Sequence, residues 1–203
     1  MKKLYELLKQ HVPDDAVHYC YDLWCSTPFN FKVTRTRNSK LGDYRFIPSK
    51  KSHTITINHD LNKFSFLVTF IHEYAHLKTQ LEYGAKAAPH GTEWKCNFKK
   101  LMHPMLNSLI FPEEILLALK KHMQNPKASS CSDPVLTVAL NGRNQQDPYK
   151  KFLQELDPGD QFLLKRRVFE MELKRRTRYI CREVKTGKKY LIPQVALVNP
   201  IEF

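Results

Sequence analysis

Apolar residues recur at intervals of three and four along much of the first 125 residues, a spacing typical of amphipathic helices. The longest run begins at Leu61 and continues to about residue 83, and it is apolar enough to predict a buried helix. Asp60 or Asn62 is the expected N-terminal cap of this helix. Shorter runs predict further helices: two within residues 1–25, one from Thr92, and one from Pro112 to about His122.

Alternating apolar and polar residues predict strands in two other regions. Polar turns separate the first three strands, which favour a small antiparallel meander over residues 31–37, 44–47 and 53–57. Five more short runs predict a small β unit, at residues 135–140, 162–164, 168–173, 178–184 and 189–192. We therefore expect an α+β protein with a helical domain at residues 1–125, a linker region at 126–157 and a small basic β unit at 158–203.

The chain is strongly basic, which changes the partners to be expected. Its 203 residues include 33 Lys or Arg and 20 Asp or Glu, a formal charge of +13 that favours polyanions such as DNA. Two segments concentrate the positive charge, residues 32–51 and 165–189. Phe169, Tyr179 and Tyr190 lie within or beside the second segment and could stack on bases. A solvated basic surface without a nucleic-acid partner is the alternative that the sequence leaves open.

The cysteines and the hydropathy of the chain indicate which cellular compartment the protein occupies. The five cysteines are odd in number and form no Cys-x-x-Cys pair, which argues against a disulfide framework and against a zinc site made of cysteines alone. A reducing compartment fits, so we expect a cytoplasmic protein. Apolar stretches are far shorter than the roughly 20 residues that cross a bilayer, and Glu6 and Lys9 interrupt the only run that resembles a secretory leader. We therefore expect no membrane partner.

The predicted buried helix contains the sequence His72-Glu73-Tyr74-Ala75-His76. Side chains at positions i and i+4 share one helix face, so both imidazoles can bind one Zn²⁺. Glu73 lies one residue round the helix, beside the metal position, where its carboxylate can take a proton from water that zinc activates. The alternative is that these are ordinary polar positions on an amphipathic helix, but their burial without a metal would be costly.

A catalytic zinc needs a third protein ligand and one open position. His90 is the next histidine along the chain, and a helix-loop-helix hairpin would bring it to the metal, with Trp94 packing the second helix on the first. Glu82 or Glu93 is the alternative third ligand. The metzincin spacing needs a glycine at position 79 and a histidine at position 82. This chain has Thr79 and Glu82 there, so the metzincin class is excluded. The remaining histidines considered are expected at surface or capping positions: His53, His59, His103 and His122.

These motifs together resemble the SprT-like family of zinc metallopeptidase domains. The residues that carry the likeness are His72-Glu73-x-x-His76 and His90-Gly91-x-x-Trp94-Lys95, with weaker likeness upstream at residues 35–37, 41–45 and 55–58. The likeness spans about residues 5–125 and implies a zincin-like domain. It further implies zinc held by His72, His76 and His90, with Glu73 as general base, and in eukaryotic relatives the cleavage of proteins crosslinked to DNA.

We therefore expect a zinc-dependent endopeptidase of SprT-like type that acts on proteins associated with DNA. The alternative is a nucleic-acid-binding module with a structural or vestigial zinc site, and a metal-dependent hydrolase of another substrate is a third reading. Relatives that end in a zinc ribbon carry paired cysteines, whereas residues 162–198 contain only Cys181, so a degenerate ribbon without a second zinc is expected. Tyr44, Tyr83 and His103 are open candidates for stabilising the oxyanion.

Overall fold

The computed structural model describes residues 2–37, 39–128, 133–142 and 149–201. The chain forms two compact units, residues 1–130 and residues 131–203, here called unit 1 and unit 2. Each unit contains its own sheet, of three strands in unit 1 and of six strands in unit 2. The protein therefore belongs to the α+β class, as the sequence pattern predicts.

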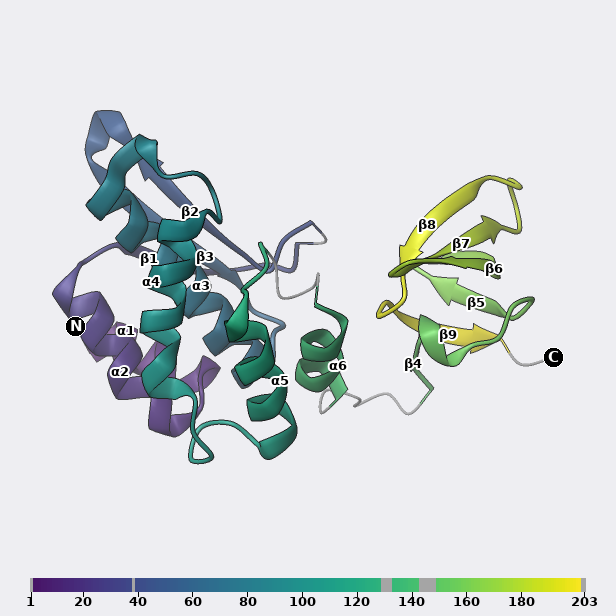
Figure 1. Ribbon diagram of the computed structural model, residues 1–203, viewed down its shortest axis with the longest axis horizontal. Helices are drawn as coiled ribbons and strands as arrows, with labels where there is room; N and C mark the ends of the chain where they lie inside the picture. Colours follow the sequence, from purple (N-terminus) through teal and green to yellow (C-terminus); the bar gives the residue numbers. More distant parts are fainter. Residues whose placement is uncertain (1, 38, 129–132, 143–148, 202–203) are drawn as a thin grey trace. The chain divides into compact units, whose positions relative to one another are not determined.

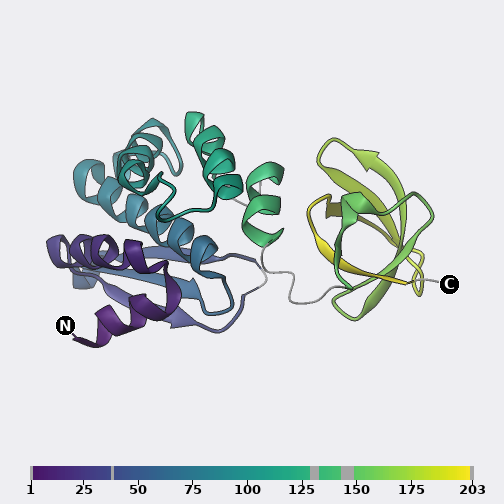
Figure 2. The same ribbon diagram turned by 90° about the horizontal axis from the view of Figure 1, so that it is seen from below.

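Unit 1 is layered around one long helix, α3 (Lys63–Tyr83). The three-stranded sheet packs on one side of α3, and α4 packs against α3 as well (Figures 1 and 2). The other elements of unit 1 are α1 (Lys2–His11), α2 (Val17–Ser26), β1 (Asn30–Thr34), β2 (Gly42–Ile47), β3 (Ser52–Asn58), α4 (Thr92–Met102) and α5 (Glu113–Gln124). Short 3₁₀ helices occupy Asp14–Ala16, Pro48–Lys50, Gly84–Lys86 and His103–Met105.

Local sequence signals explain both ends of α3. The backbone N–H of Ser65 donates a hydrogen bond of 2.8 Å to Oδ1 of Asn62, which satisfies one of the free N–H groups of the first turn. Gly84 follows the helix with a φ of +60°, a conformation that glycine adopts without strain. Most of α3 between these ends is buried, so its polar side chains have lost much of their contact with water.

The sheet of unit 1 has the strand order β1-β3-β2, which corrects the predicted antiparallel meander. β1 pairs with β3 in parallel, with Phe31 opposite Ile55, and only β2 pairs with β3 in antiparallel fashion. β3 is the central strand, and Ile55 and Ile57 are fully buried on it. The meander was the wrong prediction because strands that follow each other along the chain need not be neighbours in a sheet.

A polar anchor explains how the chain passes from β1 to the far side of β3. Asn58, which is only 1% exposed at the end of β3, donates hydrogen bonds to the backbone carbonyls of Arg37 and Lys40 at 3.2 and 2.9 Å. The Arg37 guanidinium donates in return to Oδ1 of Asn58 at 2.8 Å and to the Thr56 hydroxyl at 2.9 Å. The segment between β1 and β2 is therefore tied to the end of β3, and β2 forms the other edge of the sheet.

Unit 2 contains one helix followed by a sheet of antiparallel strand pairs in the order β4-β9-β5-β6-β7-β8. Its elements are α6 (Pro134–Gly142), β4 (Lys151–Phe152), a 3₁₀ helix (Leu153–Glu155), β5 (Gln161–Leu164), β6 (Arg167–Arg175), β7 (Arg178–Glu183), β8 (Lys189–Pro193) and β9 (Leu197–Ile201). The strand predicted at residues 135–140 is wrong, because this segment forms α6. Leu136 and Leu140 lie four residues apart and are both buried, a spacing that suits a helix. The expected linker region thus contains α6 and β4.

Apolar side chains from one face of the strands form the core of unit 2. Phe162 and Cys181 are completely buried in this cluster, and Phe169 and Met171 are nearly so. Cys181 packs here as a small apolar residue, and Cys20, Cys25 and Cys96 also carry free thiols, while Cys131 lies outside the described residues. None of the helices in the described ranges combines the length and hydropathy that a membrane span requires.

We expect Asn58→Ala to lower the free energy of unfolding of unit 1 by about 2 kcal/mol, because Arg37 and two backbone carbonyls lose their partner at a buried position. Both tryptophans, Trp24 and Trp94, lie in unit 1, so urea denaturation followed by tryptophan fluorescence measures this unit. Asn30→Ala, an exposed change on β1, should alter the value by less than about 0.5 kcal/mol. Equal effects of the two substitutions would contradict the anchor.

Candidate metal centre

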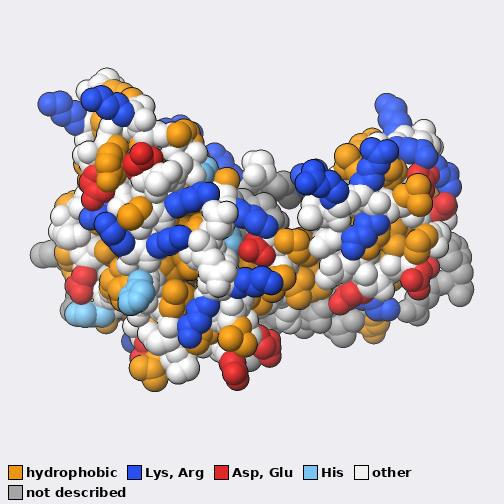
Figure 3. Space-filling view, viewed as in Figure 1, with side chains coloured by type: hydrophobic (Ala, Val, Ile, Leu, Met, Phe, Trp, Pro, Cys, Tyr) orange, Lys and Arg blue, Asp and Glu red, His pale blue; other side chains and the backbone are white. Residues whose placement is uncertain are grey.

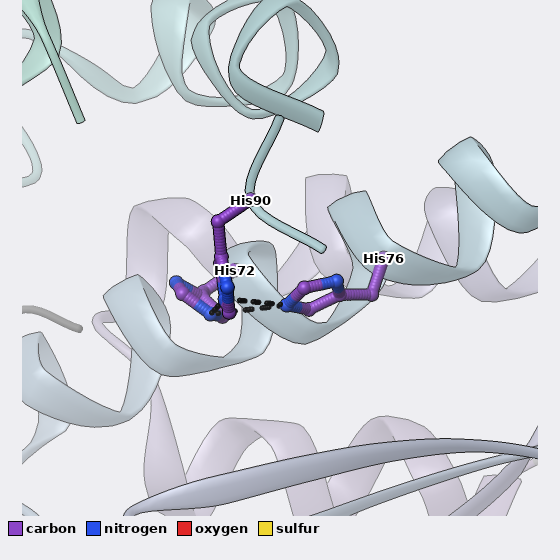
Figure 4. Close-up of side chains that lie close together, drawn as sticks. All are labelled: His72, His76 and His90. Carbon is purple, nitrogen blue, oxygen red and sulfur yellow. Dashed lines mark hydrogen bonds between the residues drawn. The ribbon is translucent and has the colours of Figure 1, made fainter. Parts of the chain in front are cut away.

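The three predicted zinc ligands meet at one point of unit 1. His72 and His76 lie on one face of α3, and His90 reaches them from the loop before α4, with the ring nitrogens pointing toward one another (Figure 4). The Nε2 atoms of His72 and His76 are 3.3 Å apart, those of His76 and His90 are 3.0 Å apart, and those of His90 and His72 are 3.3 Å apart. Within the described parts of the chain, these residues form the only group of histidine, cysteine or acidic side chains with the spacing of a metal site.

This triangle of nitrogens fits zinc. Zn–N bonds of about 2.0 to 2.1 Å at tetrahedral angles place ligand nitrogens about 3.3 Å apart, which agrees with the distances between His72, His76 and His90. A neutral imidazole carries a proton on only one ring nitrogen, so three converging nitrogens cannot all be satisfied by hydrogen bonds among themselves. A cation bound between them would remove the conflict, and three imidazole ligands would leave a zinc ion free to bind one further group.

The electrostatics of the site favour the neutral imidazoles that bind metal. Burial lowers the pKa of His72 well below its ordinary value, and the neighbouring imidazoles lower it further. Burial and the proximity of His90 lower the pKa of His76 to about 4, and burial also lowers the pKa of His90. The ligands therefore need not lose a proton to bind a cation at neutral pH.

A tight turn delivers His90 to the site. The backbone N–H of Gly91 donates to the carbonyl of Ala88 at 2.9 Å, so Pro89 and His90 are the central residues of the turn. His90 has a φ of +57°, and Pro followed by a residue of positive φ is the pattern of a type II turn. Glycine or asparagine usually occupies that position, so a histidine in a conformation of higher energy indicates a functional demand.

Trp94 provides the packing surface for the ligands. Its indole is fully buried, and its ring centroid lies 4.7 Å from that of His72, 5.2 Å from that of His76 and 4.7 Å from that of His90. Phe98 stacks on Trp94 and also contacts His72 edge-on. The predicted packing of the two helices through Trp94 is confirmed, and this packing restricts the rotamers of the ligands.

The alternative carboxylate ligands lie outside the histidine group. Glu82 instead accepts a hydrogen bond of 2.8 Å from the side chain of Asn97 and pairs with Lys78 at 3.4 Å. Asn97, only 3% exposed, also donates to the Thr79 hydroxyl at 3.1 Å. Glu82 thus helps to join α3 to α4. Glu93 likewise is not part of the histidine group.

Glu73 is buried beside the ligands and faces β2. Its side chain lines the same pocket as the three imidazoles, a cavity of about 360 Å³, and the residue is 7% exposed. Burial raises the pKa of Glu73 to about 8, with a further rise from Asp43, although a hydrogen bond from the backbone N–H of Tyr44 and the charges of Arg37 and Lys40 oppose these effects. A carboxyl group in this position can exchange a proton near neutral pH.

Close approach of β2 to α3 depends on Gly42. A Cβ atom at this position would lie 2.6 Å from a methyl carbon of Thr69 and 2.7 Å from Oε1 of Glu73, much closer than real contacts allow. Glycine at position 42 therefore lets the strand backbone reach the buried carboxyl group. The sequence offered no signal for this role, because contact between residues 42 and 73 depends on the tertiary fold.

Of the three residues predicted as open candidates for the oxyanion, only Tyr44 is found in the pocket wall. Its ring lies parallel to that of His76 at a centroid distance of 6.3 Å, and its hydroxyl forms a hydrogen bond of 2.8 Å with Nδ1 of His53. Tyr83 is 47% exposed at the end of α3. His103 is exposed as well. Tyr44 thus contacts the site mainly through its ring.

His122 was misplaced by the sequence pattern, which assigned it to a surface or capping position. It is 3% exposed and lies in the wall of the same pocket. His53 also lies near the site through its contact with Tyr44, whereas His59 is exposed, as predicted. A helical stripe of buried residues at positions 115, 119 and 122 would have indicated the burial of His122.

The basic segment of unit 2 differs from the predicted base-stacking surface. Phe169 and Tyr179 belong to the apolar core, with 3% and 8% exposure. The Arg167 guanidinium and the Lys174 ammonium lie over their outer sides, 5.1 and 5.7 Å from the respective ring centres. Tyr190 is partly buried beneath Arg167, whose guanidinium lies 4.5 Å from the ring centre. Lysine and arginine side chains are spread over the visible face of both units (Figure 3). These residues present charge to the solvent, but no stacking platform.

Comparisons with models of protein families, with curated proteins and with solved structures found no match to this chain. The likeness to SprT-like domains therefore rests on the motif residues alone.

We expect the protein to bind one equivalent of Zn²⁺ at the three histidines. His90→Ala should weaken zinc binding by about 100-fold or more, because it removes one of three ligands and leaves the other two in place. Competition with a chromogenic chelator measures the affinity, and saturating zinc should raise the melting temperature of unit 1. The exposed change His103→Ala should leave both values as in the wild type, and an equal loss in the two variants would contradict the assignment.

Without metal, the stability of unit 1 should depend on the ionisation of Glu73. Because folding raises its pKa from 4.5 to about 8, the folded state binds the proton more tightly, and the free energy of unfolding falls as pH rises through this window. Glu73→Gln should remove the fall, making the variant more stable than the wild type by roughly 4 kcal/mol at pH 8.5 and nearly as stable at pH 4.5.

Urea denaturation in EDTA at these two pH values, followed by tryptophan fluorescence, measures the difference. Glu6→Gln removes an exposed carboxylate on α1 and serves as the matched control, for which the same stability as in the wild type is expected at both pH values. A stability gain of Glu73→Gln that does not change with pH would contradict the ionisation of a buried Glu73.

Proposed function

We propose that the protein is a zinc-dependent endopeptidase of SprT-like type. The observation that carries this proposal is the convergence of three imidazoles at 3.0 to 3.3 Å, with the buried carboxyl group of Glu73 in the same pocket. A structural zinc site has four protein ligands, whereas three ligands with an open position are typical of catalytic zinc. The buried acid beside an open site favours hydrolysis over a purely structural role.

Each group in the pocket has a separate task under this proposal. Bound zinc supplies the Lewis acidity that makes water nucleophilic near neutral pH and polarises the scissile carbonyl. Glu73 accepts the proton of the attacking water and passes it to the leaving amine. The positive charge of a nearby cation favours the ionised form of Glu73, so the carboxylate would be available at neutral pH despite its burial.

The position of β2 supports a polypeptide substrate. β2 pairs only with β3 among the described strands, so one of its edges is open, and residues 42–44 of this strand line the pocket. An extended peptide can add to an open strand edge through backbone hydrogen bonds. A peptide bound along β2 would pass beside Glu73 and the three histidines. One of its amide bonds would then lie next to the carboxyl group and the metal position.

DNA remains a proposed partner, supported by charge alone. Exposed basic residues occupy three turns of unit 2: Lys165 and Arg166, Arg175 and Arg176, and Lys185 and Lys188. Part of the remaining charge is neutralised internally, because Arg167 pairs with Glu183 and Lys189 with Glu172. These turns favour contacts to phosphates over recognition of bases. A nucleic-acid-binding module with a vestigial metal site is the competing function.

We expect the zinc-loaded full chain to cleave β-casein, an unfolded protein, and Glu73→Gln to reduce the cleavage rate by about 1,000-fold, because the proton acceptor is lost. Gel electrophoresis and mass spectrometry of the fragments measure cleavage, with and without a single-stranded oligonucleotide. Zinc affinity should be unchanged in Glu73→Gln.

His103→Gln is the matched control, and it should cleave like the wild type. Equal cleavage by the wild type and Glu73→Gln would contradict the proposed role of Glu73. If the zinc-loaded wild type binds the oligonucleotide but cleaves no protein, the binding-module function replaces the endopeptidase.

A further inference from the structure

His122 adds a fourth imidazole to the wall of the metal pocket. It comes from α5, a helix that carries none of the three predicted zinc ligands. It lies on α5, is 3% exposed, and lines the same cavity as His72 and Glu73. His122 is also among the groups that lower the pKa of His72. It lines the cavity from α5, whereas Glu73 lies against β2 at Gly42.

The position of His122 in α5 is one that packing alone would fill with an apolar residue. Ile115 and Leu119 on the same helix face are fully buried, and His122 continues this stripe at the next helical interval. Burying an imidazole in place of a leucine costs free energy unless the ring makes polar interactions. A buried polar group at a core position, beside a reactive site, is typical of a functional residue.

Hydrogen bonds hold the end of α5 in place relative to the metal ligands. The Lys95 ammonium donates to Oδ1 of Asn125 at 2.8 Å, and the Lys99 ammonium donates to the backbone carbonyl of Gln124 at 2.7 Å. Both lysines lie on α4, the helix that follows His90 and carries Trp94. The end of α5 that carries His122 is thus held against α4, and preorganised stabilisation of a transition state requires such a fixed support.

Three other polar side chains in the pocket wall have protein partners. The Thr69 hydroxyl donates to the carbonyl of Ser65 at 2.7 Å, and the Lys40 ammonium is paired with Asp43 at 2.8 Å. The Tyr44 hydroxyl is engaged with His53. An imidazole has two ring nitrogens, so His122 can keep an interaction within the protein through one nitrogen and still offer the other to a substrate.

We propose that His122 is a further catalytic residue, which donates a hydrogen bond to the carbonyl oxygen of the scissile amide as negative charge develops there. This rests on the proposed peptidase function. Glu73 handles the proton from the β2 side of the pocket, and His122 stabilises the carbonyl oxygen from the α5 side. Because the hydrogen bond strengthens as the charge grows, it lowers the barrier more than it tightens substrate binding.

Three variants of the zinc-loaded full chain test this role. His122→Leu fits the apolar stripe of α5 and should fold, His122→Gln keeps an N–H donor, and His103→Leu is the matched exposed control. We expect His122→Leu to reduce kcat for casein-derived peptides by about 100-fold with KM nearly unchanged. His122→Gln should recover part of the loss, and His103→Leu should behave like the wild type.

A second readout does not depend on turnover. A peptide phosphonamidate, whose tetrahedral anionic phosphorus group resembles the transition state, should bind His122→Leu at least about tenfold more weakly than the wild type. Zinc affinity and melting temperature, measured in parallel, should stay the same. An analogue affinity equal to that of the wild type would overturn the proposal, and so would a parallel loss of zinc affinity, which would assign His122 to orienting His72.

The outcomes also separate this inference from the peptidase function. If the wild type cleaves peptides and His122→Leu cleaves them equally well, His122 has no catalytic role and the peptidase function stands. If the zinc-loaded wild type neither cleaves peptides nor binds the phosphonamidate, the peptidase function fails, and the role of His122 fails with it.

Discussion

The convergence of three imidazole nitrogens in a buried pocket is the constraint on which the site depends. With nitrogens 3.0 to 3.3 Å apart, positive charges on two of the rings would repel each other, and burial disfavours a charge on any of them. Three structural features hold the rings in this arrangement. One turn of α3 spaces His72 from His76, a positive φ brings in His90, and the Trp94 indole packs against all three rings. A divalent cation placed between the rings would accept a lone pair from each of the three nitrogens, which neutral imidazoles can offer.

The placement of Glu73 lowers the stability of unit 1 once the carboxyl group ionises. A carboxyl group at 7% exposure costs free energy once it ionises, and a leucine at this helix position would suit the surrounding core better. The backbone N–H of Tyr44 lowers that cost in part. Its contact requires β2 to come close to α3, which is feasible only because residue 42 has no side chain. The buried acid, the glycine and the strand edge therefore form one arrangement, and none of them is explained by packing alone.

Sequence reasoning succeeded where the interactions are local. The long helix, its Asn62 cap and the i, i+4 pair of histidines depend on residues within a few positions of each other, and all are found in the structure. The approach of His90 to this pair was also predicted correctly, because a hairpin of two adjacent helices spans a short stretch of chain. The sheet order, the role of Gly42 and the burial of His122 were missed. The sheet order and the role of Gly42 depend on contacts between segments far apart in the sequence, which periodicity does not encode, whereas the apolar stripe of Ile115 and Leu119 pointed to the burial of His122.

The two units distribute polar and apolar groups in opposite ways. Unit 1 buries ionisable side chains around a pocket, whereas unit 2 fills its interior with an apolar cluster and leaves most of its basic residues in solvent. Since Phe169 and Tyr179 are part of that cluster, the basic turns of unit 2 have only charge to offer a partner. Binding through charge alone is insensitive to base sequence and weakens steeply with salt. The basic turns of unit 2 would therefore accept a nucleic acid of any sequence, whereas any selectivity for the group bound at the histidines has to come from unit 1, whose strand β2 and helix α3 line that pocket.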